Sequence, residues 1–172
     1  MNFTQSHADK GTAETPPKAN ALAVLHSSLD HEWTTPQWLF DALNAEFGFT
    51  LDPCSTHENA KCAHHFTKEE DGLWQDWGDS VVFMKPPFGH AIAGWMRKAY
   101  ESAKAGATVV RLIPARTDTA YWHQYAMKSE IRLLRGRLRF GDGKRVAPFP
   151  SAIVVMLPDR FRLVAPDPGE RS

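Results

Sequence analysis

The feature that most constrains the fold is a repeated order in which short apolar segments run into polar or proline-rich loops and alternate with amphipathic segments. The apolar segments, rich in β-branched and aromatic residues as strands are, span 49–51, 80–84 and 108–113. Strands that alternate with helices predict a mainly parallel α/β sheet with helices on its faces. Ligands bind such sheets at the carboxyl ends of the strands, and Asp52 and Lys85 both sit at such ends.

The helices are predicted from apolar residues at helical spacing. The first is expected to have Thr35 as its cap, Pro36 in its first turn and Gly48 as its stop. Its apolar face is Leu39, Phe40, Leu43 and Phe47. A second helix is expected over about 91–104, with Gly106 beyond its end. Its buried stripe is Ile92, Trp95, Met96, Ala99 and Ala103.

The remaining elements are expected to be shorter. A helix over 118–127 is followed by strands over 131–134, 137–140 and 152–157. Gly141-Asp142-Gly143 and Ser151 are typical of turns. We therefore expect the last strands to form a hairpin, which gives the sheet an antiparallel edge.

Length and composition favour a single folded unit. With 172 residues, of which 42% are hydrophobic, the chain suits one globular domain. Residues 1–29 are rich in Ser, Thr, Ala, Lys and Pro without apolar periodicity, and we expect them to be a flexible arm. Residues 30–158 then form the domain. Residues 159–172 alternate proline with charge and are expected to be a tail.

Charge and hydropathy limit the partners and the compartment. The chain has 20 basic and 20 acidic residues, so its affinity for an anion must come from the placement of charge. It contains neither an apolar run of ~18 residues nor a secretory signal, and we expect a cytoplasmic protein that does not bind a membrane. Cys54 and Cys62 are therefore expected to be free thiols.

Several segments together, in order along the chain, resemble the phage-type N6-adenine DNA methyltransferases. The matching segments are Glu32 to Phe40, Leu51 to Ser55, Glu58 to Cys62, Phe66-Thr67, Glu70 to Leu73, Asp76-Trp77 and Lys85 to Gly89. The resemblance implies a Rossmann-like methyltransferase fold, with S-adenosylmethionine as cofactor and double-stranded DNA as substrate. It also implies a bacterial host of a phage or prophage.

The resemblance implies where the cofactor binds. It assigns the cofactor pocket to Thr34, Thr35, Pro36, Asp52, Pro53, Cys54, Ser55 and Asp71. A helix N-terminus near Thr35 would offer unpaired N–H groups to the methionine carboxylate, and Asp52 would lie near the cofactor ammonium group. Asp71 resembles the residue beside the cofactor adenosine. Taken alone, Thr-Pro is an ordinary helix start and Asp-Pro an ordinary turn.

The catalytic loop in this resemblance is Lys85-Pro86-Pro87-Phe88. In the family an aromatic residue at Phe88 stacks on the flipped base, and the side chain before the prolines accepts a hydrogen bond from the amine to be methylated. That side chain belongs to Asn, Asp or Ser, whereas a protonated lysine only donates. We therefore expect severely reduced activity. Lys85 reflects either an inactivating substitution, a natural inactive relative or an active variant with another acceptor.

A basic stretch is the candidate DNA surface. Its residues are Arg132, Arg135, Arg137, Arg139, Lys144 and Arg145, and Arg116, which precedes the stretch, is assigned to the same surface. On a strand Arg135, Arg137 and Arg139 would share one face, although a solvated face is the plain alternative. Asp118 and Tyr121 could border the base pocket, while Trp122 is assigned to packing. No separate sequence-reading domain is visible, so loose sequence specificity is expected.

Other functions agree less well with these residues. Cys54, His57, Cys62, His64 and His65 lie within a dozen positions, but their spacing matches no common zinc pattern, and no metal is expected. A catalytically silent module that binds the cofactor, DNA or both is the main alternative to a methyltransferase. Cytosine N4 is a less favoured target than adenine N6.

Overall fold

The structure is a computed structural model that describes residues 34–161 except 142 and 144. The predicted arm, 1–29, and most of the predicted tail lie outside these residues, so this division of the chain stays a prediction. The first residues of the tail, Asp159–Phe161, form a short 3-10 helix, η3. In the described part of the chain no helix is long and apolar enough to cross a membrane.

The elements follow the predicted order closely. The helices are α2 (Gln37–Phe47), α3 (Ile92–Ala105), α4 (Ala120–Gln124) and the 3-10 helix η2 (Ala126–Lys128). The strands are β1 (Leu51–Asp52), β2 (His64–His65), β3 (Val81–Met84), β4 (Thr108–Pro114), β5 (Glu130–Leu133), β6 (Arg139–Phe140), β7 (Arg145–Val146) and β8 (Ser151–Met156). All five residues of the predicted α3 stripe are buried.

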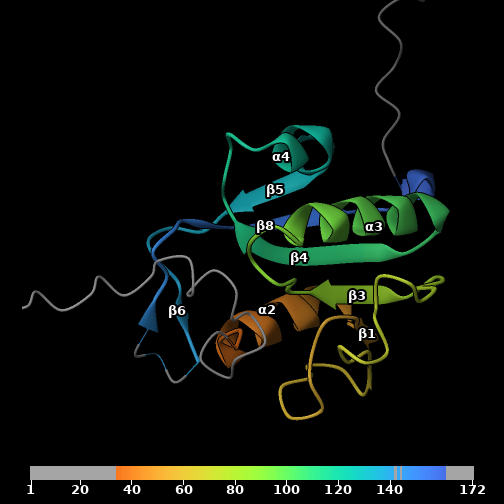
Figure 1. Ribbon diagram of the computed structural model, residues 1–172, viewed down its shortest axis with the longest axis horizontal. Coiled ribbons are helices and arrows are strands. Elements are labelled where there is room, and N and C mark those ends of the chain that lie inside the picture. The colour runs from red at the N-terminus through yellow and green to blue at the C-terminus, as the bar shows by residue number, and fades with distance from the viewer. Residues whose placement is uncertain (1–33, 142, 144, 162–172) are drawn as a thin grey trace, which may run out of the picture.

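A mixed sheet forms the centre of the molecule (Figure 1). Among the described residues it has six strands in the order β2-β1-β3-β4-β8-β5. The first four are parallel to one another, and β8 is antiparallel to both β4 and β5. This confirms the predicted mainly parallel sheet with an antiparallel edge, and it agrees with a Rossmann-like fold.

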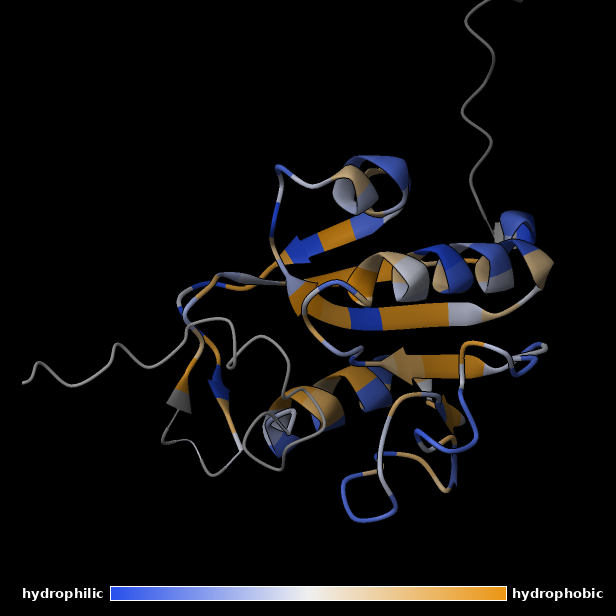
Figure 2. Ribbon diagram, in the orientation of Figure 1, coloured by the Kyte–Doolittle hydropathy of each residue, from blue (hydrophilic) through white to orange (hydrophobic). Residues whose placement is uncertain are grey.

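Helices α2 and α3 cover opposite faces of this sheet. Neighbouring strand residues point to opposite faces, so Val82 and Phe83 belong to different apolar clusters. Phe83 meets Phe40 of α2 with ring centroids 5.1 Å apart. Val82 packs in the cluster of Trp95 from α3, which stacks on Trp77. Figure 2 shows the apolar residues gathered on β3, β4 and β8, with polar residues on the outer side of α3.

Two helix predictions were wrong in detail, and one strand was missed. Helix α2 begins one residue later than expected, because the Pro36 carbonyl accepts the hydrogen bonds of Leu39 and Phe40 and no side chain caps the helix. The helix predicted over 118–127 is divided into α4 and η2, with Tyr125 in a non-helical conformation between them. Strand β2 was not predicted, since it is held only by pairing with β1.

The glycine-rich turn forms a hairpin, but outside the main sheet. It joins β6 and β7 into a separate two-stranded sheet, whereas the antiparallel edge is made by β8 and β5. Residues Arg135 to Leu138 are not in a strand. The physical reason is that the buried, apolar β8 pairs along its whole length with β4 and takes the place beside it.

Candidate functional site

The carboxyl ends of β1 and β3 bring Asp52 and Lys85 together. The strands are parallel neighbours, with Leu51 opposite Val82. Asp52 is only 4% exposed, and its carboxylate accepts hydrogen bonds from the backbone N–H groups of Lys61 (3.1 Å) and Cys54 (3.4 Å). Burial raises the pKa of Asp52, and these two hydrogen bonds oppose the rise.

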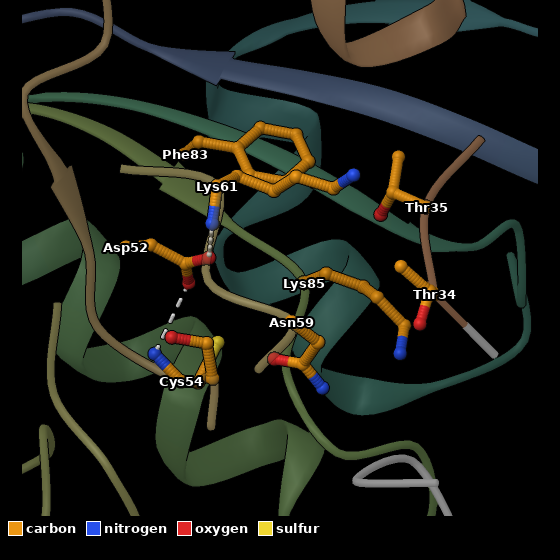
Figure 3. Close-up of a pocket in the computed structure, with 9 residues that line it drawn as sticks. Thr34, Thr35, Asp52, Cys54, Asn59, Lys61, Phe83 and Lys85 are labelled. Carbon is orange, nitrogen blue, oxygen red and sulfur yellow. Dashed lines mark hydrogen bonds between the residues drawn. The ribbon is translucent and has the colours of Figure 1, made fainter. Parts of the chain in front are cut away.

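Three cavities lie in a row along this edge and share lining residues. The first, of about 390 Å³, is lined by Pro53, Cys54, Ser55, Thr67, Lys68, Asp71, Gly72, Leu73, Pro87 and Trp95. The second, of about 20 Å³, is lined by Thr34, Thr35, Asp52, Cys54, Ser55, Asn59, Lys61, Phe83 and Lys85 (Figure 3). The third, of about 310 Å³, is lined by Thr34, Gln37, Phe40, Glu58, Asn59, Ala60 and Lys61. We call them the large, narrow and outer cavities.

Seven of the eight residues assigned to the cofactor line this row. Only Pro36 does not, because it is buried at the start of α2. Ser55 lines both the large and the narrow cavity, and its buried hydroxyl has no hydrogen-bond partner within the described residues. An unsatisfied buried hydroxyl is costly, so its position suits a polar ligand that reaches from one cavity to the other. The size and donor set of the row fit a nucleoside cofactor with an amino-acid end.

A tight turn forms one wall of the large cavity. Asp71 has a positive φ of 49°, and its carboxylate accepts the N–H of Leu73 at 3.2 Å. At Gly72 the turn passes so close to β1 that a Cβ there would collide with the carbonyl oxygen of Pro53. The indole N–H of buried Trp77 donates to the Gly72 carbonyl at 2.9 Å and holds the turn from the other side.

The predicted catalytic loop leaves β3 between the large and the narrow cavity. Pro87 lines the former and Lys85 the latter. Figure 3 shows the Lys85 side chain extending from the strand end toward Thr34. Its Nζ lies 5.6 Å from the ring centroid of Phe88, which is buried. Burial lowers the pKa of Lys85 to about 8, against the attraction of Cys54 and Asp52.

Sequence reasoning assigned no role to Lys61 and Asn59. Both line the narrow and the outer cavity. The Lys61 ammonium donates to the Gln37 side chain at 2.7 Å and lies 5.7 Å from the ring centroid of Phe40. Burial lowers its pKa. The only signal in the sequence was that both belong to the matching segment Glu58 to Cys62.

The basic residues assigned to DNA differ in their exposure and in their contacts. Arg132 is bound by Glu46 and Glu130, with three nitrogen–oxygen distances of 2.6 Å. Arg135, Arg137 and Arg139 are exposed, and Arg139 lies between the buried residues Leu138 and Phe140. Lys144 lies outside the described residues, Arg145 belongs to β7, and Arg116 is half-buried in the loop after β4.

The β6–β7 hairpin borders the site. The N–H of Gly141 donates to the Thr34 carbonyl at 2.9 Å. Phe140 lies edge-on to Phe88, with ring centroids 6.5 Å apart. Arg139, the neighbour of Phe140, is thereby kept near the catalytic loop. Tyr121 and Trp122 are buried in the core, and Asp118 is exposed.

The His and Cys residues do not meet at one point. The rings of His57 and His65 are hydrogen-bonded at 2.9 Å, while Cys54 and Cys62 are free thiols. Across residues 34–161, with 142 and 144 left out, no three His, Cys, Asp or Glu side chains converge so as to hold a metal ion.

Comparisons with known proteins agree with this geometry. The chain is 36% identical over 84 residues to the Escherichia coli (strain K12) protein named "Putative methyltransferase YfdM", a match that covers 44% of this chain and 92% of that protein. The family model for DNA N-6-adenine-methyltransferase (Dam) matches residues 23–156, a range that holds the whole row of cavities and the catalytic loop. The chain therefore belongs to the Dam family of DNA N-6-adenine-methyltransferases.

Proposed function

We propose that this site is built for transfer of a methyl group from S-adenosylmethionine to adenine N6 in double-stranded DNA, and that Lys85 severely impairs the transfer in this chain. The observation that carries the proposal is the row of cavities, which runs past buried Asp52 and the unsatisfied Ser55 hydroxyl to the catalytic loop. Family membership supports the reaction type.

The sizes of the cavities and their lining support one orientation of the cofactor. The large cavity has room for adenosine, and Asp71 on its wall is a suitable acceptor for a ribose hydroxyl or the adenine amine. The amino-acid end would run through the narrow cavity, where Asp52 suits its ammonium group, and its carboxylate would point toward the outer cavity, where the Lys61 ammonium suits it. The cofactor supplies an electrophilic methyl group, and the chain supplies its orientation and excludes water.

Lys85 opposes the transfer at the target end. The attacking adenine nitrogen gains positive charge, which an acceptor stabilises and an ammonium destabilises. Loss of one aligned hydrogen-bond partner costs about 10²–10³ in rate, and an opposed charge adds to this cost.

Methyl transfer to DNA by this chain and by its Lys85→Asn variant tests the proposal, with cofactor binding measured in both. We expect both proteins to bind the cofactor, and DNA methylation by Lys85→Asn to be at least ~10²-fold faster. If neither protein binds S-adenosylmethionine, the proposed function is wrong.

The second candidate is a silent module that binds the cofactor and DNA without transfer, which the lysine at the acceptor position favours. It predicts that Lys85→Asn binds both ligands and still methylates nothing. For an active variant we propose loose sequence specificity, because no separate sequence-reading domain is visible among the described residues. Methylation of a plasmid at one short sequence only would contradict that proposal.

A further inference from the structure

The position of the Lys85 amine differs from that of the acceptor it replaces. A lysine side chain is two bonds longer than that of asparagine, and this difference approaches the length of a hydrogen bond, about 2.9 Å. An asparagine oxygen here would stop one hydrogen bond short of the target amine, so the longer Lys85 side chain would bring its Nζ close to the place of the target amine. Its distance of 5.6 Å from the Phe88 centroid agrees, because Phe88 is the ring on which the base would stack.

An alkylamine at this place is also a better nucleophile than adenine N6. The lone pair of N6 is delocalised into the purine ring, whereas that of a neutral lysine is localised on nitrogen. With the pKa of Lys85 lowered to about 8, roughly a tenth of this side chain is neutral at pH 7. The charged and titratable groups that face it are Asp52 from β1, Cys54 from the loop after β1, and Lys61 from the loop before β2.

We propose that Lys85 is itself a methyl acceptor, so that the chain transfers a methyl group from S-adenosylmethionine to its own Lys85 Nζ. This inference rests on the proposed cofactor site. The lone pair of neutral Nζ forms the new N–C bond while the S–C bond breaks, and the electron pair of that bond stays on sulfur. The positive charge passes from the sulfonium to the methylated lysine. The proton that Lys85 gives up beforehand passes to solvent, with which this half-buried side chain keeps contact.

Lys61 lines the same narrow cavity but is not equivalent. Its ammonium points toward the outer cavity, because it donates to the Gln37 side chain at 2.7 Å and lies 5.7 Å from the ring centroid of Phe40, and both residues line that cavity. Lys85 is on the loop that also lines the large cavity through Pro87. The geometry therefore favours Lys85 over Lys61 as the methyl acceptor.

The test is the mass of the full chain after incubation with S-adenosylmethionine, followed by peptide fragmentation. We expect the mass of the chain to increase by one methyl group, which fragmentation assigns to Lys85. The reaction should be first-order, with a rate constant that is independent of protein concentration. The rate should rise with pH and level off above about 8. Lys85→Arg should bind the cofactor and gain no methyl group, whereas Lys104→Arg, an exposed control on α3, should be methylated as the parent is.

A second readout needs no transfer. Acetic anhydride labels neutral lysines, and bound S-adenosylhomocysteine should slow acetylation of Lys85 at least several-fold while leaving Lys104 unaffected. The proposal is overturned if the cofactor binds and Lys85 stays unmethylated, if the methyl group appears on Lys61, or if S-adenosylhomocysteine binds without protecting Lys85. Absence of cofactor binding would instead refute the proposed function on which this inference rests.

Discussion

The two ends of the candidate site differ in what they offer a ligand. The cofactor end has a cavity of about 390 Å³, a wall fixed by Gly72 and Trp77, and polar groups that suit a nucleoside. The target end is the catalytic loop, where Lys85 replaces the usual acceptor residue beside the narrow cavity of about 20 Å³. We infer from this difference that cofactor binding and methyl transfer are separable, because the proposed cofactor and target groups lie at the ends of different strands, β1 and β3.

The largest expected effect separates charge from hydrogen bonding at the target end. Lys85→Met removes the charge and supplies no acceptor, whereas Lys85→Asn removes the charge and also supplies an acceptor. We expect Lys85→Asn to methylate DNA about 10²–10³ times faster than Lys85→Met, because the loss of one aligned hydrogen-bond partner lowers a catalytic rate by about that factor. Equal rates in labelled methyl transfer, at equal cofactor affinity, would mean that the charge alone silences the chain.

At the cofactor end the strongest expected effect is that of Asp52→Asn. The change replaces a buried carboxylate by an amide and should weaken cofactor binding by about 10–100-fold, the value of one hydrogen bond to a charged group. Calorimetric titration with S-adenosylhomocysteine measures it. Asp79→Asn, at an exposed side chain near Arg160, should leave the affinity unchanged. An unaltered affinity in Asp52→Asn would remove Asp52 from the cofactor site.

A substitution at Gly72 should disrupt the turn that forms the wall of the large cavity. In Gly72→Ala the new Cβ collides with the Pro53 carbonyl, and we expect a loss of about 1–3 kcal/mol in the free energy of unfolding, as for other overpacked sites. Gly94→Ala is the matched control, because nothing lies within 4 Å of its added Cβ on α3. It should stabilise the protein by about 1 kcal/mol. Urea unfolding compares the two, and equal stabilities would contradict this account of the turn.

The smallest expected effect concerns the basic residues. Arg139 is exposed on the hairpin beside the catalytic loop, and Arg139→Ala should lower the salt dependence of DNA affinity by about one phosphate contact. Arg132 is already bound by Glu46 and Glu130. Arg132→Ala should therefore leave that dependence unchanged and affect stability instead. Fluorescence titrations of duplex DNA at several salt concentrations distinguish the two, and identical slopes would show one undivided basic surface.

The fold was predictable where local pattern and burial agree. The α3 stripe is a regular helical period, and Gly48 ends α2 in the left-handed conformation, with φ of 67°. Strand β2 was not predictable, because His64-His65 has no strand propensity and forms through pairing with β1. The place of the hairpin outside the main sheet also depends on long-range competition, since β8 occupies the position beside β4.

The clustering of the candidate site residues was predictable as far as the motifs extend. Seven of the eight residues assigned to the cofactor meet at one edge of the sheet. Lys61 was missed because its contact with Gln37 joins residues far apart in the sequence. The engagement of Arg132 by Glu46 was likewise invisible, since the two lie on β5 and α2. Sequence spacing alone cannot reveal such pairs.

The most direct test of the central claim is a crystal structure of this chain, unaltered at Lys85, with S-adenosylhomocysteine. The account predicts adenosine in the large cavity between Pro53 and Asp71, and the amino-acid end in the narrow cavity near Asp52. The sulfur should face the Lys85 Nζ. Density for the ligand elsewhere, or an empty row of cavities at saturating ligand, would contradict the claim that this chain keeps a working cofactor site beside a blocked target site.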